Sequence, residues 1–358
     1  MTPGPWAATA ARSLDLARAA YREISLYAPD RTPCPVDLSD NTNLFGVPPS
    51  ALAALRGSSE SVITRYPALY AGDLKGAIAA YVGASPTDVV TGCGSDDVLD
   101  SAIRAFAEPG ETLATPAPSF AMIPIFARMN GLRPVEVPLR PDHDIDADAM
   151  IATGARITYV CSPNNPTGTP ASAGAVRRLI ERARGLVIID EAYAEFAGAN
   201  WATEAPRHAR LLVVRTMSKA FGLAGLRVGY AVGNREVVAE VEKSRGPYKV
   251  SSAAERAAVA ALTDDGSWVR ARIAEVIDIR ARFTSELRAL GLDPLPSVAN
   301  FVLVPVRDAV SIALTMRRGG VAVRPMPGLP CIGDALRISI GPWEMMDAAL
   351  TRLREALS

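Results

Sequence analysis

The sequence has little of the material that metal, disulfide or histidine chemistry needs. Its 358 residues contain only four cysteines and two histidines, and no two cysteines form a C-x-x-C pair. A disulfide framework, a zinc site and a histidine-based catalytic triad are therefore not expected, and we predict no metal site.

Long apolar runs and an excess of charge of one sign are also missing. No stretch of about 18 apolar residues occurs, and the N-terminus lacks the basic and then apolar pattern of a secretory signal. Basic and acidic residues both total 38, so the net charge is zero, which argues against a nucleic-acid binder. We expect a cytoplasmic protein that binds neither membranes nor nucleic acid.

Lysine is scarce: only Lys75, Lys219, Lys243 and Lys249 occur, and the other 34 basic residues are arginines. A lysine amine can lose its proton and bond covalently to a carbonyl carbon, whereas a guanidinium stays protonated. Each lysine is therefore a candidate for covalent chemistry.

Short apolar runs alternate with helical patterns over the first two thirds of the chain. Several runs are apolar at consecutive positions, which is typical of strands covered on both faces. The alternation predicts an α/β fold with a mostly parallel, seven-stranded sheet. The predicted strands are residues 88–91, 112–115, 134–137, 157–162, 186–190, 211–215 and 228–232, with helices at 95–107 and 171–184.

The pattern changes near residue 247. Long helical patterns cover 251–290, short strands are predicted at 300–306, 321–324 and 336–340, and a helix at 344–357 ends the chain. This predicts a large domain at 41–246 and a smaller α+β domain made of 1–40 and 247–358. Residues 7–23 are expected to form a helix in its N-terminal arm.

One lysine directly follows a predicted buried strand, in the segment LLVVRTMSKAFGLAGLRVG at residues 211–229. Ligands of α/β proteins bind at such strand ends. Ser218 and Arg227 are close to Lys219 in sequence, and both side-chain types suit a phosphate. A lone loop lysine is more often an ordinary surface residue, so this interpretation depends on other motifs.

Three other strand ends carry polar residues. TGCGSDD at 91–97 is a glycine-rich turn that opens a helix and suits a phosphate; CSPNNPTG at 161–168 forms a turn with two asparagines; and LVIIDEAY at 186–193 ends a strand on Asp190. Each alone is compatible with an ordinary turn or helix cap. Together they predict four adjacent strand ends that present an anion site, an Asn, an Asp and a Lys in that order.

This set matches what pyridoxal 5′-phosphate (PLP) needs. Its aldehyde needs a lysine, its ring nitrogen a carboxylate, and its phenolate oxygen and phosphate need hydrogen-bond donors. In the order and spacing of these motifs, the chain resembles the fold-type-I PLP-dependent aminotransferases of class I/II. It is most similar to the histidinol-phosphate aminotransferases, from about Tyr27 to the C-terminus.

The resemblance implies a fold, a cofactor and a reaction. The fold is that of the aspartate aminotransferase-like PLP transferases, and the cofactor is PLP. The reaction is transfer of the amino group of histidinol phosphate to 2-oxoglutarate, which gives imidazole acetol phosphate and glutamate in histidine biosynthesis. The partners are thus a small-molecule amino donor and a 2-oxo acid acceptor.

The resemblance also implies roles for individual residues. Lys219 is the Schiff-base lysine, Asp190 the partner of the pyridinium nitrogen, and Tyr193 with Asn165 the contacts of the phenolate oxygen. Further cofactor contacts are implied for Ser95, Asp96, Phe120, Ser218 and Arg227. Tyr66 matches a tyrosine that reaches the neighbouring subunit's cofactor phosphate, which implies a homodimer. Substrate contacts are implied for Tyr27, Asn165, Arg324 and Arg337.

The chain departs from this branch at three places. It reads Asn-Thr-Asn-Leu at 41–44 where the branch carries Asn-Glu-Asn-Pro, Asp96-Asp97 where Asp-Glu is usual, and Phe120 where Tyr is frequent. The first difference lies where it would line the substrate pocket, so the imidazole substrate stays open at this stage. The alternatives are an aminotransferase for aromatic or other amino acids, a PLP lyase of the threonine-phosphate decarboxylase type, and a non-enzymatic PLP-binding regulator.

Overall fold

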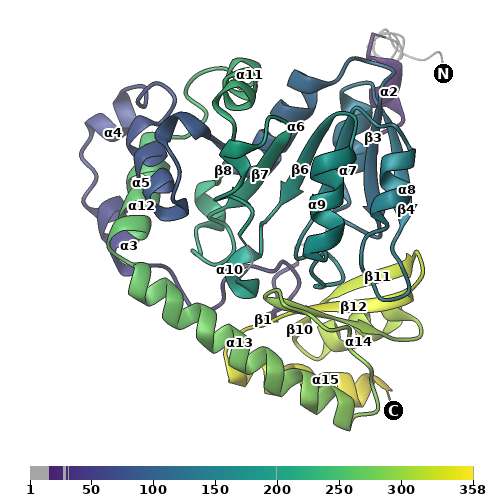
Figure 1. Ribbon diagram of the computed structural model, residues 1–358. Helices are drawn as coiled ribbons and strands as arrows, with labels where there is room; N and C mark the ends of the chain where they lie inside the picture. Colours follow the sequence, from purple (N-terminus) through teal and green to yellow (C-terminus); the bar gives the residue numbers. More distant parts are fainter. Residues whose placement is uncertain (1–15, 27–29, 31, 199, 358) are drawn as a thin grey trace, which may run out of the picture.

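A computed structural model describes residues 16–26, 30, 32–198 and 200–357 (Figure 1). A twisted sheet lies between two layers of helices, and a smaller group of strands and helices packs below it in this view. Within the described ranges, no helix is long and apolar enough to span a membrane.

The central sheet has seven strands in the order β2-β8-β7-β6-β5-β3-β4. All neighbours are parallel except β8, which runs antiparallel to both β2 and β7. The predicted mostly parallel sheet is therefore confirmed, with each strand within two residues of its expected ends. The strands are β2 (Val89–Cys93), β3 (Thr112–Ala117), β4 (Arg133–Pro138), β5 (Ile157–Cys161), β6 (Leu186–Asp190), β7 (Leu211–Thr216) and β8 (Val228–Gly233).

The central strands are buried over their whole length because helices cover both faces of the sheet. Successive residues point to opposite faces, so Leu186 and Ile188 pack into one core while Val187 and Ile189 pack into the other. The first core is closed by α6 (Gly94–Phe106), α7 (Met122–Met129) and α11 (Arg235–Arg245). The second is closed by α5 (Gly72–Val82), α8 (Ala147–Ala152), α9 (Ala173–Arg182) and α12 (Ser252–Thr263).

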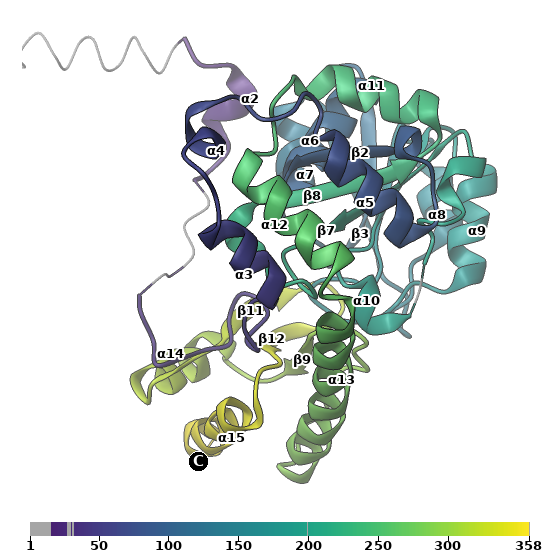
Figure 2. The ribbon, with the colours of Figure 1, turned by 90° about the vertical axis from the view of Figure 1, so that its left-hand side faces the viewer.

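The second group of elements is built on a three-stranded antiparallel sheet, β11-β12-β9. The long helix α13 follows α12 down to this group, where α14 and α15 also lie (Figures 1 and 2). The bounds are β9 (Phe301–Pro305), β11 (Arg324–Leu329), β12 (Gly333–Ser339), α13 (Gly266–Ala289), α14 (Ala309–Arg318) and α15 (Trp343–Leu357). Shorter helices elsewhere are α3 (Pro49–Arg56), α4 (Ser61–Thr64) and α10 (Ala194–Ala197).

A short parallel pair brings the start of the chain to this second group. Strand β1 (Val36–Asp37) pairs with β10 (Val321–Ala322), so the predicted strand at 321–324 is divided into β10 and the beginning of β11. The Leu38 amide donates to Ala322 O (2.8 Å), and the Asn41 amide donates to Ser339 Oγ (2.8 Å). Residues 38–41 are therefore held along the β12 side of the molecule.

Only residues 16–23 of the predicted N-terminal helix at 7–23 can be compared with the structure, because residues 1–15 lie outside the described residues. In the described part, α2 covers only Ala19–Arg22, and Arg18 before it has an extended backbone (φ −56°, ψ 140°). The expectation of helix at 16–18 was therefore wrong. The short helix buries none of its residues, so no apolar face stabilises a longer one.

Strand β8 and the turn that opens α6 approach each other so closely that one of them must present glycine. A Cβ atom on Gly229 would lie 2.1 Å from the Ser95 amide nitrogen and 2.2 Å from the Gly94 carbonyl carbon. Both are backbone atoms, which cannot rotate away. Gly229 therefore allows the glycine-rich turn to rest on the sheet.

This contact yields a prediction about stability. Gly229→Ala should lower the free energy of unfolding by about 3 kcal/mol, since the methyl group forces two backbone segments apart. The measurement is urea unfolding of the cofactor-free protein. Gly76→Ala is the matched control: Gly76 lies inside α5 with nothing within 4 Å of a Cβ, so alanine there should stabilise by about 0.5–1 kcal/mol. Equal stability of the two variants would contradict the prediction.

Candidate active site

A cavity of about 490 Å³ brings together most of the predicted site residues. It is lined by residues from the strand ends of the central sheet together with residues of β11 and β12. The predicted residues that line it are Ser95, Asp96, Phe120, Asn165, Asp190, Tyr193, Ser218, Lys219, Arg227, Arg324 and Arg337. Residues from six separate parts of the sequence thus meet around one space.

The order of the strand ends differs from the prediction. The Asn, Asp and Lys do follow three neighbouring strands, β5, β6 and β7, but β8 lies between β7 and β2. The glycine-rich anion turn is therefore on the lysine side of the sheet, not on the asparagine side. Because β8 is antiparallel, it begins at this same edge, which places Arg227 directly beside that turn.

Lys219 lies after β7 with its amine inside the cavity. Its Nζ donates a hydrogen bond to the main-chain oxygen of Asp40 (3.3 Å) and lies 5.8 Å from the centroid of the Tyr193 ring. Burial, together with the positive charge of Arg337, lowers the pKa of Lys219 to about 8. About a tenth of this amine is therefore unprotonated at pH 7, far more than for an ordinary lysine, and the unprotonated form is the one that nucleophilic or general-base chemistry requires.

Asp190 ends β6 and is buried at the base of the cavity. Burial raises the pKa of its carboxyl to about 6, while hydrogen bonds from Tyr159 and from the Ala192 amide oppose the rise. The Tyr159 hydroxyl donates to Oδ2 (2.8 Å) and the Ala192 amide to Oδ1 (3.0 Å). The carboxylate is thus ionised at neutral pH and held in one orientation, which suits a partner for a protonated ring nitrogen.

The two asparagines of the SPNNPTG turn have different partners. Asn164 is buried, and its amide donates to Pro118 O (3.0 Å) and Thr167 Oγ1 (3.0 Å), so it holds the turn together. Asn165 lines the cavity, and its side-chain oxygen accepts from Arg337 Nη1 (2.7 Å). The structure therefore places the residue with the predicted binding role in the cavity.

Two arginines lie side by side at the end of the cavity opposite the central sheet. Arg324 and Arg337 are direct partners in the antiparallel pair β11-β12, so both side chains project from one face of the sheet. Arg337 Nη2 donates to Ser39 O (2.8 Å), and Arg324 Nη2 donates to Asp40 Oδ1 (2.8 Å). The segment 39–40 therefore contacts both guanidinium groups.

The glycine-rich turn lies at the start of α6 beside Arg227, whose guanidinium also pairs with Asp96 (3.5 Å). Gly94 has φ +82°, and a Cβ there would lie 2.4 Å from a guanidinium nitrogen of Arg227. Ser95 and Asp96 begin the helix, whose amides and dipole favour a negative charge. The Ser218 hydroxyl accepts from Thr216 Oγ1 (2.9 Å) nearby. Hydroxyl, amide and guanidinium donors are thus available for a phosphate.

One described residue of the prediction, Tyr66, does not line this cavity. Tyr66 is 85% exposed, and its ring stacks on Tyr248 with 5.1 Å between centroids. Tyr27 lies outside the described residues. In the other direction, sequence reasoning missed Tyr159 and Asp40. The only signal for Tyr159 was a polar ring within an apolar strand, two residues before the residue that pairs with Asp190.

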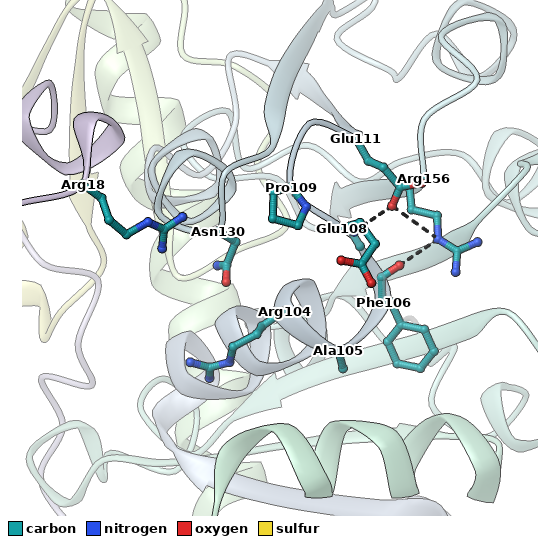
Figure 3. Close-up of a pocket in the computed structure, with 10 residues that line it drawn as sticks. Arg18, Arg104, Ala105, Phe106, Glu108, Pro109, Glu111, Asn130 and Arg156 are labelled. Atoms are coloured by element: carbon teal, nitrogen blue, oxygen red, sulfur yellow. Dashed lines mark hydrogen bonds and ion pairs between the residues drawn. The ribbon is translucent and has the colours of Figure 1, made fainter.

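A second cavity of about 400 Å³ lies where β3 and β5 begin, beside the end of α6 (Figure 3). Its arginines contact groups of this chain. Arg156 Nε donates to Phe106 O (2.8 Å), Arg104 pairs with Asp100 (3.3 Å), and Arg18 Nη1 donates to Met129 O (3.3 Å). None of the predicted site residues that the structure describes lines this cavity.

Known proteins resemble this chain over most of its length. Residues 34–353 match the family described as aminotransferase class I and II. The histidinol-phosphate aminotransferase of Roseiflexus castenholzii is 38% identical over 334 residues, 89% of each chain. The aromatic amino acid aminotransferase of Mycobacterium tuberculosis is 36% identical and covers 91% of this chain and 94% of its own. The histidinol-phosphate aminotransferase of Sinorhizobium meliloti, crystallised with PLP, superposes with a TM-score of 0.87 at 26% identity, over 96% and 97% of the two chains.

Because Asp190 is buried, its ionisation should lower the free energy of unfolding, and this cost should depend on pH. Because its pKa is raised, the folded protein binds the Asp190 proton more tightly than the unfolded chain between about pH 4 and pH 6. The stability that this group contributes is therefore lost as the pH rises through that range. Asp190→Asn should make the cofactor-free protein more stable than wild type by about 3 kcal/mol at pH 7, and the difference should vanish below about pH 4.

Tyr159→Phe provides the opposing variant in the same urea-unfolding series. It removes a hydrogen bond to the ionised carboxylate, so it should raise the pKa of Asp190 and extend the loss of stability to higher pH. We expect a cost of about 1–3 kcal/mol at pH 7. Identical pH profiles for wild type and both variants would show that the Asp190 carboxyl does not carry the effect.

Proposed function

The chain belongs to the class I and II aminotransferase family, and we propose that it transfers the amino group of histidinol phosphate to 2-oxoglutarate. The products are imidazole acetol phosphate and glutamate, in histidine biosynthesis. The observation that carries this choice of donor is the pair Arg324 and Arg337, which face the same cavity as Lys219. Two neighbouring guanidinium groups suit a phosphate monoester, and the two histidinol-phosphate aminotransferases named above support the same donor.

A second candidate is an aminotransferase for aromatic amino acids. It is favoured by the relative with that name and by the carboxylate of Asp40, which pairs with Arg324 (2.8 Å) and leaves less positive charge for a dianion. A carboxylate donor needs one arginine, and Arg337 would serve it. A PLP lyase on the same scaffold would release carbon dioxide instead of passing an amino group to a 2-oxo acid.

PLP fits the groups that line the cavity. Asp190 would hold its ring nitrogen, Tyr193 and Asn165 its phenolate oxygen, Phe120 one face of its ring, and Lys219 its aldehyde. Its phosphate would bind to the α6 turn, with contacts from Ser95, Asp96, Ser218 and Arg227. When bound, PLP supplies an aldehyde for covalent attachment and a protonated ring that accepts electron density from the reacting carbon.

The chain's own residues then have distinct tasks. The ionised Asp190 holds a proton on the ring nitrogen, because its pKa of about 6 lies below neutral pH. The Lys219 amine, with a pKa of about 8, would take a proton from the α-carbon of the donor and return it to the carbon that comes from the cofactor's aldehyde. Arg337 and Asn165, which contact each other at 2.7 Å, orient the donor's anionic end.

We also propose that the enzyme is a cytoplasmic homodimer with shared active sites. The cofactor domain would comprise residues 41–246, and residues 1–40 and 247–358 would form the smaller domain and the N-terminal arm. Tyr66 would contact the cofactor phosphate of the neighbouring subunit, and Tyr27 would reach a substrate. The support for Tyr66 is its position: it is exposed and lies against Tyr248, on a surface that also exposes Leu69 and Ile63.

The choice of donor can be tested with half-reactions. Purified holoenzyme is mixed separately with histidinol phosphate, phenylalanine and glutamate, and the absorbance change on conversion to pyridoxamine phosphate is followed. We expect histidinol phosphate and glutamate to convert the cofactor at low concentrations, with phenylalanine at least about tenfold less effective in kcat/KM. Conversion by phenylalanine and glutamate without histidinol phosphate would replace the first candidate by the second.

The shared active site predicts complementation between two inactive variants. Lys219→Ala should be inactive, and Tyr66→Ala should bind PLP more weakly. If Tyr66 serves the neighbouring subunit, a hybrid dimer has one site with both native residues. Mixing the variants under conditions that exchange subunits should then restore activity, up to about a quarter of wild type.

The control for this experiment is Lys243→Ala. Lys243 is exposed and pairs only with Glu240 among the contacts described for it, so mixing this variant with Tyr66→Ala should give the average of the two activities. If the Lys219→Ala mixture also gives no more than the average, Tyr66 acts within its own subunit or outside the site.

A further inference from the structure

We propose that Asp40 is a specificity-determining residue that lowers the affinity of the donor cavity for dianionic groups relative to monoanionic ones. The cavity would therefore accept carboxylate-bearing donors alongside phosphate monoesters. This inference concerns the substrate end of the same cavity and so deepens the proposed function. It rests on that function only for the identity of the donors.

The first support is the ion pair itself. Asp40 and Arg324 both line the cavity, and Asp40 Oδ1 lies 2.8 Å from Arg324 Nη2. Their side chains are only 22% and 20% exposed, so water screens the pair less than it would at the surface. The carboxylate therefore cancels much of the charge that Arg324 would otherwise offer to a ligand.

The second support is that the backbone holds Asp40 in place on both sides. Leu38 pairs with Ala322 and Asn41 with Ser339, each at 2.8 Å. The main-chain oxygen of Asp40 also accepts a hydrogen bond from the Lys219 amine (3.3 Å). One residue thus contacts the reactive amine through its backbone and the second arginine through its side chain, and it cannot swing out of the cavity without breaking these contacts.

The third support is the arrangement of the two arginines. Arg324 and Arg337 are direct cross-strand partners, and Ser39 O accepts from Arg337 Nη2 at 2.8 Å and from Arg324 Nε at 3.5 Å. Like charges that face each other across two strands repel. The carboxylate of Asp40 relieves this repulsion at Arg324, so a carboxylate joins the two guanidinium groups at this end of the cavity.

The charge of the ligand decides how much its affinity changes when the Asp40 charge is removed. A dianion that binds between the arginines feels the repulsion of Asp40 twice as strongly as a monoanion at the same distance. For a charge roughly 6 Å away and an effective dielectric constant of about 20, one unit of ligand charge changes the affinity by about tenfold after screening by salt. Removal of the Asp40 charge should therefore favour dianions over monoanions by that factor.

The test uses Asp40→Asn, because asparagine keeps the size of the side chain and an oxygen that can accept from Arg324. Holoenzyme is titrated by calorimetry with methyl phosphate, which is dianionic near pH 8, and separately with acetate. We expect Asp40→Asn to bind acetate about tenfold more tightly than wild type and to bind methyl phosphate about a hundredfold more tightly, so the preference for the dianion rises about tenfold. Unchanged or weaker methyl phosphate binding, or an equal gain for both ligands, would overturn the proposal.

Asp148→Asn is the matched control, because Asp148 also pairs with an arginine, Arg178, but does not line the cavity. It should bind both ligands as wild type does. If Asp40→Asn fails to fold, Asp40→Ser removes the same charge and carries the same expectation.

A kinetic comparison separates this inference from the proposed function. In Asp40→Asn, the KM for histidinol phosphate should fall about tenfold relative to the KM for phenylalanine. If wild type does not use histidinol phosphate at all, the proposed donor is wrong, while the methyl phosphate titration still decides the role of Asp40. If histidinol phosphate is used and its relative KM does not change, only the inference about Asp40 fails.

Discussion

Two ionisable groups buried in one cavity, the carboxylate of Asp190 and the amine of Lys219, set the chemistry of the site at a cost in stability. Burial disfavours the charged form of each, which raises one pKa to about 6 and lowers the other to about 8. Near neutral pH the Asp190 carboxyl is still mostly ionised, and a minor fraction of the Lys219 amine is unprotonated. These are the states that the chemistry needs, and the surrounding hydrogen bonds from Tyr159 and Ala192 keep the carboxylate ionised despite its burial.

The antiparallel strand β8 organises the other half of the site. It enters the sheet between β7 and β2 and begins at the edge where the parallel strands end. Arg227 therefore lies beside the turn of α6, and Gly229 gives this turn the space to lie on the sheet. A parallel strand at this position would begin at the opposite edge, so the anion site would lack its guanidinium group.

Local sequence predicted the strands of the central sheet well and the N-terminal helix poorly. The seven strands of the sheet are apolar over consecutive positions because both of their faces are covered, and this signal needs no knowledge of their neighbours. The N-terminal helix was overpredicted, because the helical pattern of residues 16–18 has no apolar surface to pack on in the described structure. The division of the chain into domains at residue 246 remains a prediction.

Local motifs were enough to identify the cofactor and the family: one lysine follows a strand, one aspartate ends another, and a glycine-rich turn opens a helix. Those signals are local, because each motif needs its own turn and its own strand. The order of the strand ends, the hydrogen bond from Tyr159 to Asp190, and the pairing of Asp40 with Arg324 became visible in the folded chain alone. The last pair joins residues 284 positions apart, and such a contact arises from the way β1, β10 and β11 pack, which no local pattern records.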